Sequence, residues 1–318
     1  MKTSHRIFST VGGLLVAGTF LCAVTGCSEA ESANAAEAIS GPADAASFEQ
    51  YWFHQGAEIS RFRLVQSRYG DQHEGDLTLV YVTEPFNPET QVKADNPNAT
   101  NPAPVPVLKL NAMRAFNTGL YRYNIMKSVF APTDLDMHPW PLKVTHSVQD
   151  WCGQTFAQLN RLDEGYHLRS FSYFQSDGDV DAEMPEAMPE DAIWTLIRLD
   201  PERLPTGDFS LIRGPLQARV AHVPTQVVNA EASLGVNERG QPGGEGNLRY
   251  TVRVPAEGRT LAWVFQPNFP WRLEYFSEER RGLPKTEAFR QETIFSWYWN
   301  ENRPAQESKR QEALGFAY

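Results

Sequence analysis

The chain has 318 residues, with 29 Lys and Arg against 39 Asp and Glu, so its formal net charge is −10. This acidic balance disfavours a nucleic acid as partner, because phosphate binding needs an excess of basic side chains. Hydrophobic residues make up 41% and charged residues 21% of the chain. These values are typical of a globular core and exclude collagen, a coiled coil and a polytopic membrane protein.

The first 26 residues have the pattern of a lipoprotein signal peptide. Lys2 and Arg6 form a positive region, residues 7–24 are largely apolar, and Gly26 precedes Cys27. This order is typical of an export leader, which is cleaved before a cysteine that carries diacylglycerol. We therefore expect lipidation of Cys27, attachment to a membrane through the acyl chains, and a location in the bacterial cell envelope, at the outer membrane. An uncleaved transmembrane anchor is the alternative, because the apolar stretch is about long enough to span a bilayer thinly.

Residues 27–47 are predicted to be the acylated cysteine and a flexible tether. They are rich in Ala, Ser and acidic residues, and they contain no aromatic and no basic residue. Cleavage before Cys27 would remove Lys2 and Arg6 and change the net charge from −10 to −12. Cys152 would then be the only thiol of the folded domain, so no internal disulfide is possible.

From residue 48 onward the pattern mainly has a period of two, which indicates strands. The runs at 58–69 and 76–83 flank a turn-rich segment and predict an antiparallel hairpin. Residues 84–106 contain six prolines and predict a long surface loop. Further strands are expected at 107–111, 122–130, 142–148, 155–160, 166–175, 209–212, 217–222, 226–230, 247–254, 259–266, 272–276 and 286–299.

One helix is expected at residues 189–199. Pro189, Glu190 and Asp191 suit the first turn of a helix, and apolar residues follow at helical spacing before Pro201. The glycine-rich segment 235–246 is expected to be a hairpin loop. Residues 48–299 are therefore interpreted as a single β-rich domain, and residues 300–318 as a C-terminal extension.

The pattern predicts a mainly β fold with one large antiparallel curved sheet, or a half-open barrel, and one helix packed against it. Residues 294–299 alternate without a clearly polar face, so this last strand needs cover on both sides. A β-sandwich is the alternative architecture.

Cys152 and His146 are the first candidates for catalysis. They lie six residues apart, and a cysteine beside a histidine can form a nucleophilic thiolate. The segment Trp151-Cys152-Gly153 matches half of a thioredoxin site, but Thr155 stands where the second cysteine would be. The alternative is a buried structural cysteine.

Asp177, Asp179 and Asp181 are the candidates for a metal site. They place carboxylates at alternate positions, as in a calcium loop, but Ala182 and Met188 stand where the EF-hand pattern requires Gly and Glu. A solvated acidic turn is the alternative. No nucleotide, phosphate or zinc motif is present, so the sequence implies no cofactor.

The eight tryptophans leave two interpretations open. Core filling is the commoner use of tryptophan, because the side chain buries a large apolar area. A row of exposed rings would instead suit stacking on sugars.

Four stretches of the chain carry a resemblance to a known group: YWFHQGAEISRFRLVQSRYGDQHEGDLTLVYVTEPF, VLKLNAMRAFNTGLYRYNIMKSVF, THSVQDWCGQTFAQLN and AIWTLIRLDPERLPTGDF. They resemble uncharacterised bacterial envelope lipoproteins that are sometimes named "septum formation inhibitor Maf". True Maf proteins are cytoplasmic α/β nucleotide pyrophosphatases with a Ser-x-Ser-x-Arg-Arg loop near the N-terminus, which this chain lacks. The resemblance implies an envelope lipoprotein and gives no residue a role.

Three functions are consistent with these features. The first is a non-catalytic envelope lipoprotein that binds an apolar or amphipathic ligand, or an envelope partner protein. The second is a thiol or hydrolytic enzyme centred on Cys152 and His146. The third is a glycan-binding surface lipoprotein.

Overall fold

The computed structural model describes residues 38–316. The predicted signal peptide, the lipidation site Cys27 and the first part of the predicted tether lie outside the described residues. Among those that are described, no helix has both the length and the apolar character needed to cross a bilayer.

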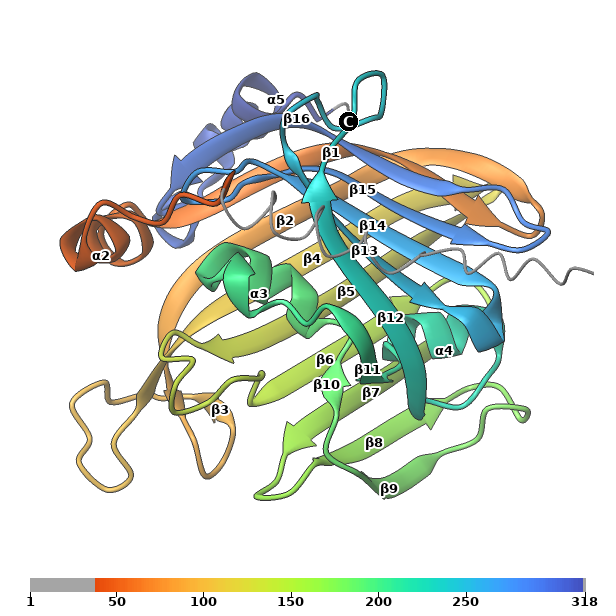
Figure 1. Ribbon diagram of the computed structural model, residues 1–318, viewed down its shortest axis with the longest axis horizontal. Coiled ribbons are helices and arrows are strands. Elements are labelled where there is room, and N and C mark those ends of the chain that lie inside the picture. The colour runs from red at the N-terminus through yellow and green to blue at the C-terminus, as the bar shows by residue number, and fades with distance from the viewer. Residues whose placement is uncertain (1–37, 317–318) are drawn as a thin grey trace, which may run out of the picture.

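One sheet organises the described part of the chain (Figure 1). The strands are β1 (Ala57–Arg68), β2 (Asp71–Asn87), β3 (Val92–Lys93), β4 (Val105–Thr118), β5 (Tyr121–Pro132), β6 (Lys143–Gln149), β7 (Gln154–Arg161), β8 (Tyr166–Ser172), β9 (Val180–Met184), β10 (Met188–Pro189), β11 (Gly207–Ile212), β12 (Val227–Val236), β13 (Leu248–Val254), β14 (Arg259–Phe265), β15 (Leu273–Arg280) and β16 (Thr286–Ser296).

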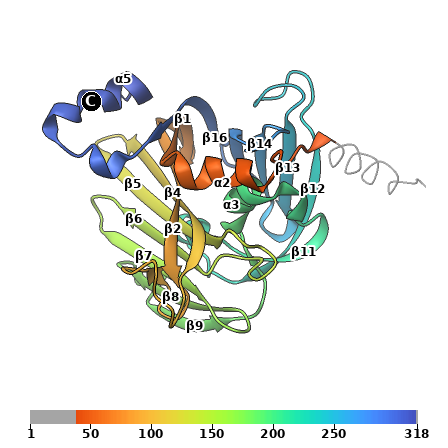
Figure 2. The ribbon, with the colours of Figure 1, turned by 90° about the vertical axis from the view of Figure 1, so that its left-hand side faces the viewer.

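The sheet is open and strongly curved. Its strand order is β10-β11-β12-β13-β14-β15-β16-β1-β2-β4-β5-β6-β7-β8-β9, with β3 paired to β2. Neighbours are antiparallel except β10 and β11. Strands β9 and β10 follow one another in the chain but form the two opposite edges, and the sheet curls between them (Figure 2). This confirms the predicted mainly β fold with one large curved sheet; the strands do not form the two separate sheets of a β-sandwich.

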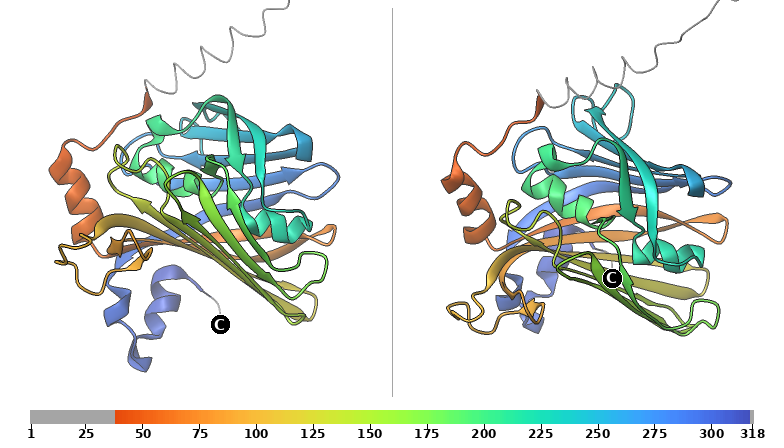
Figure 3. Two further views of the ribbon diagram at one scale, coloured as in Figure 1. Left: turned by 90° about the horizontal axis from the view of Figure 1, so that it is seen from below. Right: turned by 60° about the horizontal axis from the view of Figure 1, so that its bottom comes forward.

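The helices are α2 (Ala45–His54), α3 (Ala192–Leu199), α4 (Pro215–Ala221) and α5 (Ser308–Leu314). Helix α3 lies inside the curve of the sheet (Figure 3), and every one of its residues is buried. Its Trp194 packs edge-on against Trp263 of β14, with ring centroids 5.8 Å apart, and the Tyr81 hydroxyl donates to the Trp194 carbonyl at 3.0 Å. The sheet and this helix together fill most of the interior with their own side chains.

The predicted hairpin at the start of the domain is confirmed. Inward residues of β1 alternate with more exposed ones, and β1 pairs with β2 through Glu58 to Arg68. The predicted proline loop is wrong at both ends, because Pro85 of β2 pairs with Pro106 of β4. The two prolines lie near the end of this strand pair, where a missing N–H disrupts little of the ladder.

The prediction of a strand at residues 217–222 is also wrong, because this segment is part of α4. Gly214 precedes the helix, Pro215 occupies its first turn, and His222 ends it in the left-handed conformation at φ 53°. The predicted helix at 189–199 is present but shorter, because Met188 and Pro189 pair with β11 before α3 begins.

The structure also differs from the sequence patterns near the two ends. Helix α2 begins at Ala45, inside the segment expected to be a tether, and Asp44 caps it by accepting a hydrogen bond from the Ser47 amide at 2.8 Å. Strand β16 ends at Ser296, so the last three residues of the predicted strand 286–299 are not in it. The glycine-rich segment 235–246 does join two adjacent strands, β12 and β13.

Four tryptophans confirm the core-filling interpretation. Trp52, Trp194, Trp263 and Trp271 are each buried in the main core. Trp151, Trp297 and Trp299 are instead exposed.

Candidate functional site

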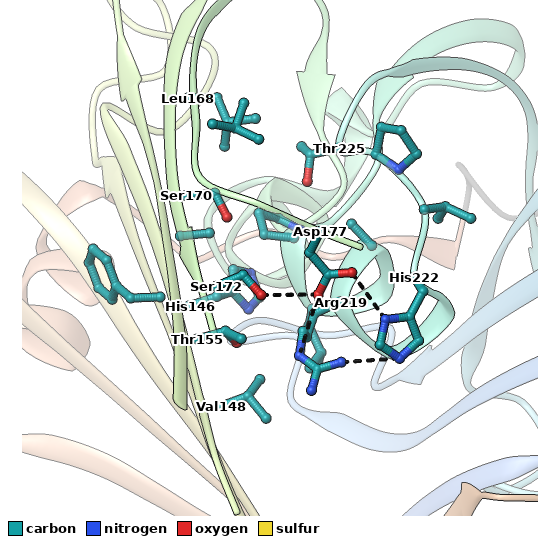
Figure 4. A pocket seen from close by; sticks show the side chains of 18 of the residues that line it. His146, Val148, Thr155, Leu168, Ser170, Ser172, Asp177, Arg219, His222 and Thr225 are labelled. Carbon is teal, nitrogen blue, oxygen red and sulfur yellow. Dashed lines mark hydrogen bonds and ion pairs between the residues drawn. The ribbon is translucent and has the colours of Figure 1, made fainter. Parts of the chain in front are cut away.

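A pocket of about 210 Å³ lies between strands β6 to β8 and helix α4 (Figure 4). Its apolar wall is formed by Val148, Leu168 and Leu216, and its hydroxyl groups include those of Thr155 and Ser170. The strand residues reach the pocket because positions 144, 146 and 148 of β6, and the matching positions of β7 and β8, face the inside of the curve. The pocket therefore combines apolar surface with several hydrogen-bonding groups.

The rim of the pocket is held by Asp177, which joins the segment after β8 to helix α4. His222 Nδ1 lies 3.0 Å from Asp177 Oδ1, and the Ser172 hydroxyl donates to Oδ2 at 3.1 Å. Arg219 Nε is 4.0 Å from Asp177 Oδ2, and its Nη1 is 3.3 Å from His222 Nε2 (Figure 4). Partial burial opposes ionisation, but the hydrogen bonds from His222 and Ser172 hold the pKa of Asp177 below its usual range.

His146 connects the pocket to buried charges behind it. It lines the pocket, it is 3% exposed, and its Nε2 lies 2.8 Å from Asp191 Oδ2. Lys127 Nζ donates to the other carboxylate oxygen of Asp191 at 2.9 Å and lies 4.3 Å from the Trp194 ring centroid. Burial opposes ionisation of Asp191, but Lys127 and His146 together hold its pKa below the usual range. Asp191 is therefore a carboxylate, to which His146 donates from Nε2.

Two residues that line the pocket have a buried nitrogen without a hydrogen-bond partner among the described residues, Nε of Arg219 and Nδ1 of His146. Nδ1 is buried and has no hydrogen-bond partner among the described residues. Buried polar atoms are nearly always paired, so an orphaned one suggests a missing ligand or water. Because Nε2 donates to the Asp191 carboxylate, Nδ1 is the ring nitrogen left to form a hydrogen bond with another group.

Next to Asp191, Glu190 faces Arg259 inside the curve of the sheet. The Arg259 guanidinium donates to both Glu190 oxygens and also lies near Glu257 and Glu278. Burial raises the pKa of Glu190 to about 7, with Arg259 opposing and the nearby carboxylates of Asp191 and Glu278 adding to the rise. Perturbed buried carboxyl groups are common at functional sites, but they also occur in structural ion networks.

We expect Glu190 to make the protein less stable as the pH rises. Its folded pKa is above the unfolded one, so between about pH 4.5 and 7 the folded state retains a proton that the unfolded state releases. Stability should therefore fall as the pH rises from about 4.5 to about 7, by up to about 3 kcal/mol at about 1.4 kcal/mol for each pKa unit. Urea denaturation of Glu190→Gln should show a flatter pH dependence than the wild type. Glu186→Gln, at a half-exposed ion pair, is the control and should retain the wild-type slope.

The structure does not bring Cys152 and His146 together. Cys152 is exposed in the turn between β6 and β7, so the prediction of a buried structural cysteine is wrong. His146 pairs with Ala157, three residues before the end of β6 at Gln149. About 10 Å of strand therefore separates His146 from this turn, at about 3.3 Å per residue. The histidine contacts Asp191 instead of the thiol.

Alkylation kinetics provide a direct check of this separation. The rate at which iodoacetamide modifies Cys152 should be the same in the wild type and in His146→Gln, because the imidazole does not contact the sulfur. Cys152→Ser should change the free energy of unfolding by less than about 0.5 kcal/mol, as is usual for an exposed side chain. A several-fold slower alkylation in His146→Gln would instead indicate a thiol and imidazole pair.

The three candidate metal ligands accept hydrogen bonds from different groups of the protein. Asp177 contacts His222, Asp179 accepts from the Ser172 amide at 3.1 Å, and Asp181 lies 2.6 Å from His167. Within residues 38–316, no group of three potential ligands is arranged to hold a metal ion. Asp177, Asp179 and Asp181 therefore do not converge on one point.

The pocket contains part of the arrangement that a hydrolase triad requires. A hydrolase triad needs a hydroxyl that donates to the free nitrogen of a histidine held by a carboxylate. His146 and Asp191 provide the second half of such a triad, but no described hydroxyl donates to Nδ1. The Ser172 hydroxyl is engaged by Asp177 instead.

Sequence reasoning identified His146 but not its partners. Asp191 was visible only as an acidic residue suited to a helix start, and it is 45 residues away from His146. Lys127 had no distinguishing signal, and His222 was assigned to a strand. No spacing rule could have connected them, because the curvature of the sheet brings them together.

No family model matches the chain, and no curated protein matches its sequence. Among solved structures, the chain is similar to the crystal structure of a β-barrel-like protein of a domain of unknown function, DUF1849, from Brucella abortus. The two are 7% identical, with a TM-score of 0.46, and the similarity covers 76% of this chain and 98% of that one.

Proposed function

We propose that this protein is a lipid-anchored lipoprotein of the bacterial cell envelope that binds a small amphipathic molecule, without reacting with it, in the pocket beside α4. The observation that carries the binding proposal is the orphaned Nδ1 of His146 at the wall of that pocket. The export leader and Cys27 support the anchor.

The size of the pocket limits the ligand. About 210 Å³ is room for roughly seven water molecules at about 30 Å³ each. This is below the roughly 300–1,000 Å³ that pockets for drug-sized ligands usually have. Helix α3 and the main core fill most of the rest of the curve, and the neighbouring cavity beside Asp191 and Trp194 has only about 50 Å³. The ligand is therefore a small molecule, or one end of a larger molecule, rather than a whole membrane lipid.

The chemistry of the wall defines the class of ligand. Val148, Leu168 and Leu216 would contact an apolar group. Nδ1 of His146 would form a hydrogen bond with a hydroxyl group of the ligand, which can donate or accept, and this would pair an atom that otherwise remains buried and unsatisfied. Asp177 is already paired with His222 and Ser172, so the rim does not require a charged ligand.

Native mass spectrometry tests for such a ligand. The mature chain, expressed with export to the periplasm and purified without detergent, should carry an additional mass that organic extraction removes. In Ser170→Phe, which places a ring in the pocket, the additional mass should be lost. Arg169→Phe is the matched control, because its side chain is the exposed neighbour on β8, and it should retain the mass.

A probe of known structure tests the role of His146. Titration with 1-hexanol should shift the imidazole ¹⁵N signal of His146, which is assigned by its absence in His146→Gln. Hexanol should shift the same signal much less in Ser170→Phe. A chain that purifies without additional mass and does not respond to hexanol would remove the binding proposal.

The anchor is tested separately. The mass of Cys27 from membrane-purified protein should include a diacylglyceryl group, and Cys27→Ser should release the protein into the soluble fraction. An unmodified Cys27 would remove the lipoprotein part of the proposal without affecting the pocket.

A further inference from the structure

A cluster of exposed aromatic side chains lies where strand β16 ends. We call Phe53, Phe295, Trp297, Tyr298 and Trp299 the aromatic patch; each is between 36% and 46% exposed. Trp299 packs edge-on against both Trp297 and Tyr298, with ring centroids 5.2 Å apart in each pair. Phe295 packs in the same manner against Tyr51 of α2 at 5.3 Å. The patch therefore joins the end of β16 to α2, and Figure 1 shows both on the same side of the molecule.

The backbone holds these two segments close together. Gly56 follows α2 and has φ 79°. A Cβ atom on Gly56 would lie 2.9 Å from the Ser296 carbonyl oxygen and 3.2 Å from the Trp297 ring, distances that require the absence of a side chain. The close contact between the backbone at Gly56 and the end of β16 therefore holds the patch in place.

The chain enters the described fold close to the aromatic patch. The Ser40 amide donates to the Pro267 carbonyl at 2.9 Å, and the Phe269 amide donates to the Ser40 carbonyl at 2.8 Å. The Phe269 ring lies 5.3 Å from Tyr51, which contacts Phe295. Thirteen residues separate Cys27 from Ser40, so the two lie no more than about 47 Å apart in any conformation, at about 3.6 Å per residue. An anchor at Cys27 would hold Ser40, and the aromatic patch near it, within reach of the membrane.

The segment that follows the patch differs in charge from the rest of the chain. Residues 300–316 contain three acidic side chains (Glu301, Glu307 and Glu312) and three basic ones (Arg303, Lys309 and Arg310), so this segment is neutral while the whole chain has a charge of −10. A neutral surface avoids the repulsion that an acidic one would meet at anionic lipids.

From these observations we infer that the aromatic patch docks the domain against the interface of the bilayer. Trp and Tyr are enriched at membrane interfaces, because their rings are apolar and their N–H or O–H groups remain hydrated. The rings of Trp297 and Trp299 are 85° apart, and those of Tyr298 and Trp299 are 76° apart. Such perpendicular rings offer no common flat surface for a row of sugars, so lipid is the better occupant.

The inference rests in part on the proposed lipid anchor at Cys27. The experiment therefore has two forms, one with the anchor and one without it. In the first, the acylated mature chain is reconstituted in phosphatidylcholine vesicles with acyl chains brominated near the carboxyl end, and quenching of tryptophan fluorescence is measured. In the second, the mature chain with Cys27→Ser is titrated with the same vesicles. If Cys27 carries no acyl group, the anchor has failed, but the second form still tests the patch.

We expect bromine to quench part of the fluorescence of the wild type in both forms. The double substitution W297S/W299S should remove this quenching and weaken vesicle binding of the unacylated chain by at least about tenfold, which corresponds to about 1.4 kcal/mol. Trp151→Ser is the matched control, because Trp151 is 75% exposed and lies in the turn between β6 and β7. It should leave quenching and binding at the wild-type level.

Two outcomes would overturn the inference. The first is quenching that is absent in the wild type or equal in the wild type and W297S/W299S. The second is a wild type in which a soluble chitin oligosaccharide shifts the fluorescence of Trp297 and Trp299 while brominated lipid has no effect, which would identify a glycan surface. An unchanged urea midpoint for W297S/W299S establishes that the double variant is folded.

Discussion

Replacing Arg198 with Met should lower the free energy of unfolding by about 3–5 kcal/mol. Arg198, on α3, donates two parallel hydrogen bonds of 2.7 Å to the Glu58 carboxylate on β1, and both side chains are almost completely buried. Burial opposes ionisation of Glu58, but Arg198 keeps its pKa below the usual range. Without Arg198 the buried carboxylate would keep only the hydrogen bond from the Tyr51 hydroxyl and the longer ion pair with Arg272. Urea denaturation followed by far-UV circular dichroism measures the loss.

Two further variants make this prediction specific. Glu58→Leu combined with Arg198→Met should recover more than half of the loss, because a buried ion pair can often be exchanged for apolar side chains without net cost. Arg203→Met removes an exposed arginine whose partner Asp136 is also exposed, and it should cost less than about 1 kcal/mol. An Arg198→Met loss no larger than that of Arg203→Met would show that the buried pair contributes little to stability.

Asp191→Asn should also cost about 3–5 kcal/mol, because it removes the carboxylate that accepts hydrogen bonds from both Lys127 and His146 behind the pocket. The folded pKa of Asp191 is below the unfolded one, so its contribution to stability is present above about pH 4 and is lost as the pH falls further. Burial already lowers the pKa of Lys127. In Asp191→Asn the pKa of Lys127 should fall further, because its negative partner is absent. The free energy of unfolding that this variant loses should therefore become smaller as the pH rises and the Lys127 amine becomes neutral.

The matched control is Asp181→Asn. Asp181 also contacts a histidine, His167 at 2.6 Å, but its side chain is 75% exposed, so we expect a change below about 1 kcal/mol. Lys127→Met combined with Asp191→Asn should be more stable than Asp191→Asn alone, because the unpaired ammonium is removed. If Asp181→Asn and Asp191→Asn lowered the free energy of unfolding equally, the buried network around Asp191 would not contribute to stability as we expect.

The proposed pocket and this network depend on each other. Asp191 holds the ring of His146 through Nε2 and leaves Nδ1 without a partner among the described residues. Asp191→Asn should therefore reduce the response of His146 to hexanol, even under conditions in which the variant remains folded. Arg198→Met, which acts at Glu58, should retain the hexanol response in the folded protein.

The sequence by itself determined the class of fold and most of the strands. Alternating residues from β1 to β8 predicted inward and outward faces, because in a strand each side chain faces opposite to the next. The helix in 189–199 was also predictable, since apolar spacing and acidic residues at its start are local features. The export leader and Cys27 remain predictions from the sequence, because they lie outside the described residues.

Only the tertiary structure decided the site. The segment 217–222 alternates like a strand, yet Pro215 and the contact of Arg219 and His222 with Asp177 make it a helix against the sheet. Arg198 and Glu58 are 140 residues apart in the chain, and they meet because the sheet curves around α3. Local periodicity reports which face of an element is buried, whereas the partner of a buried charge depends on how distant elements pack. The pocket, the free nitrogen of His146 and the aromatic patch all depend on such packing.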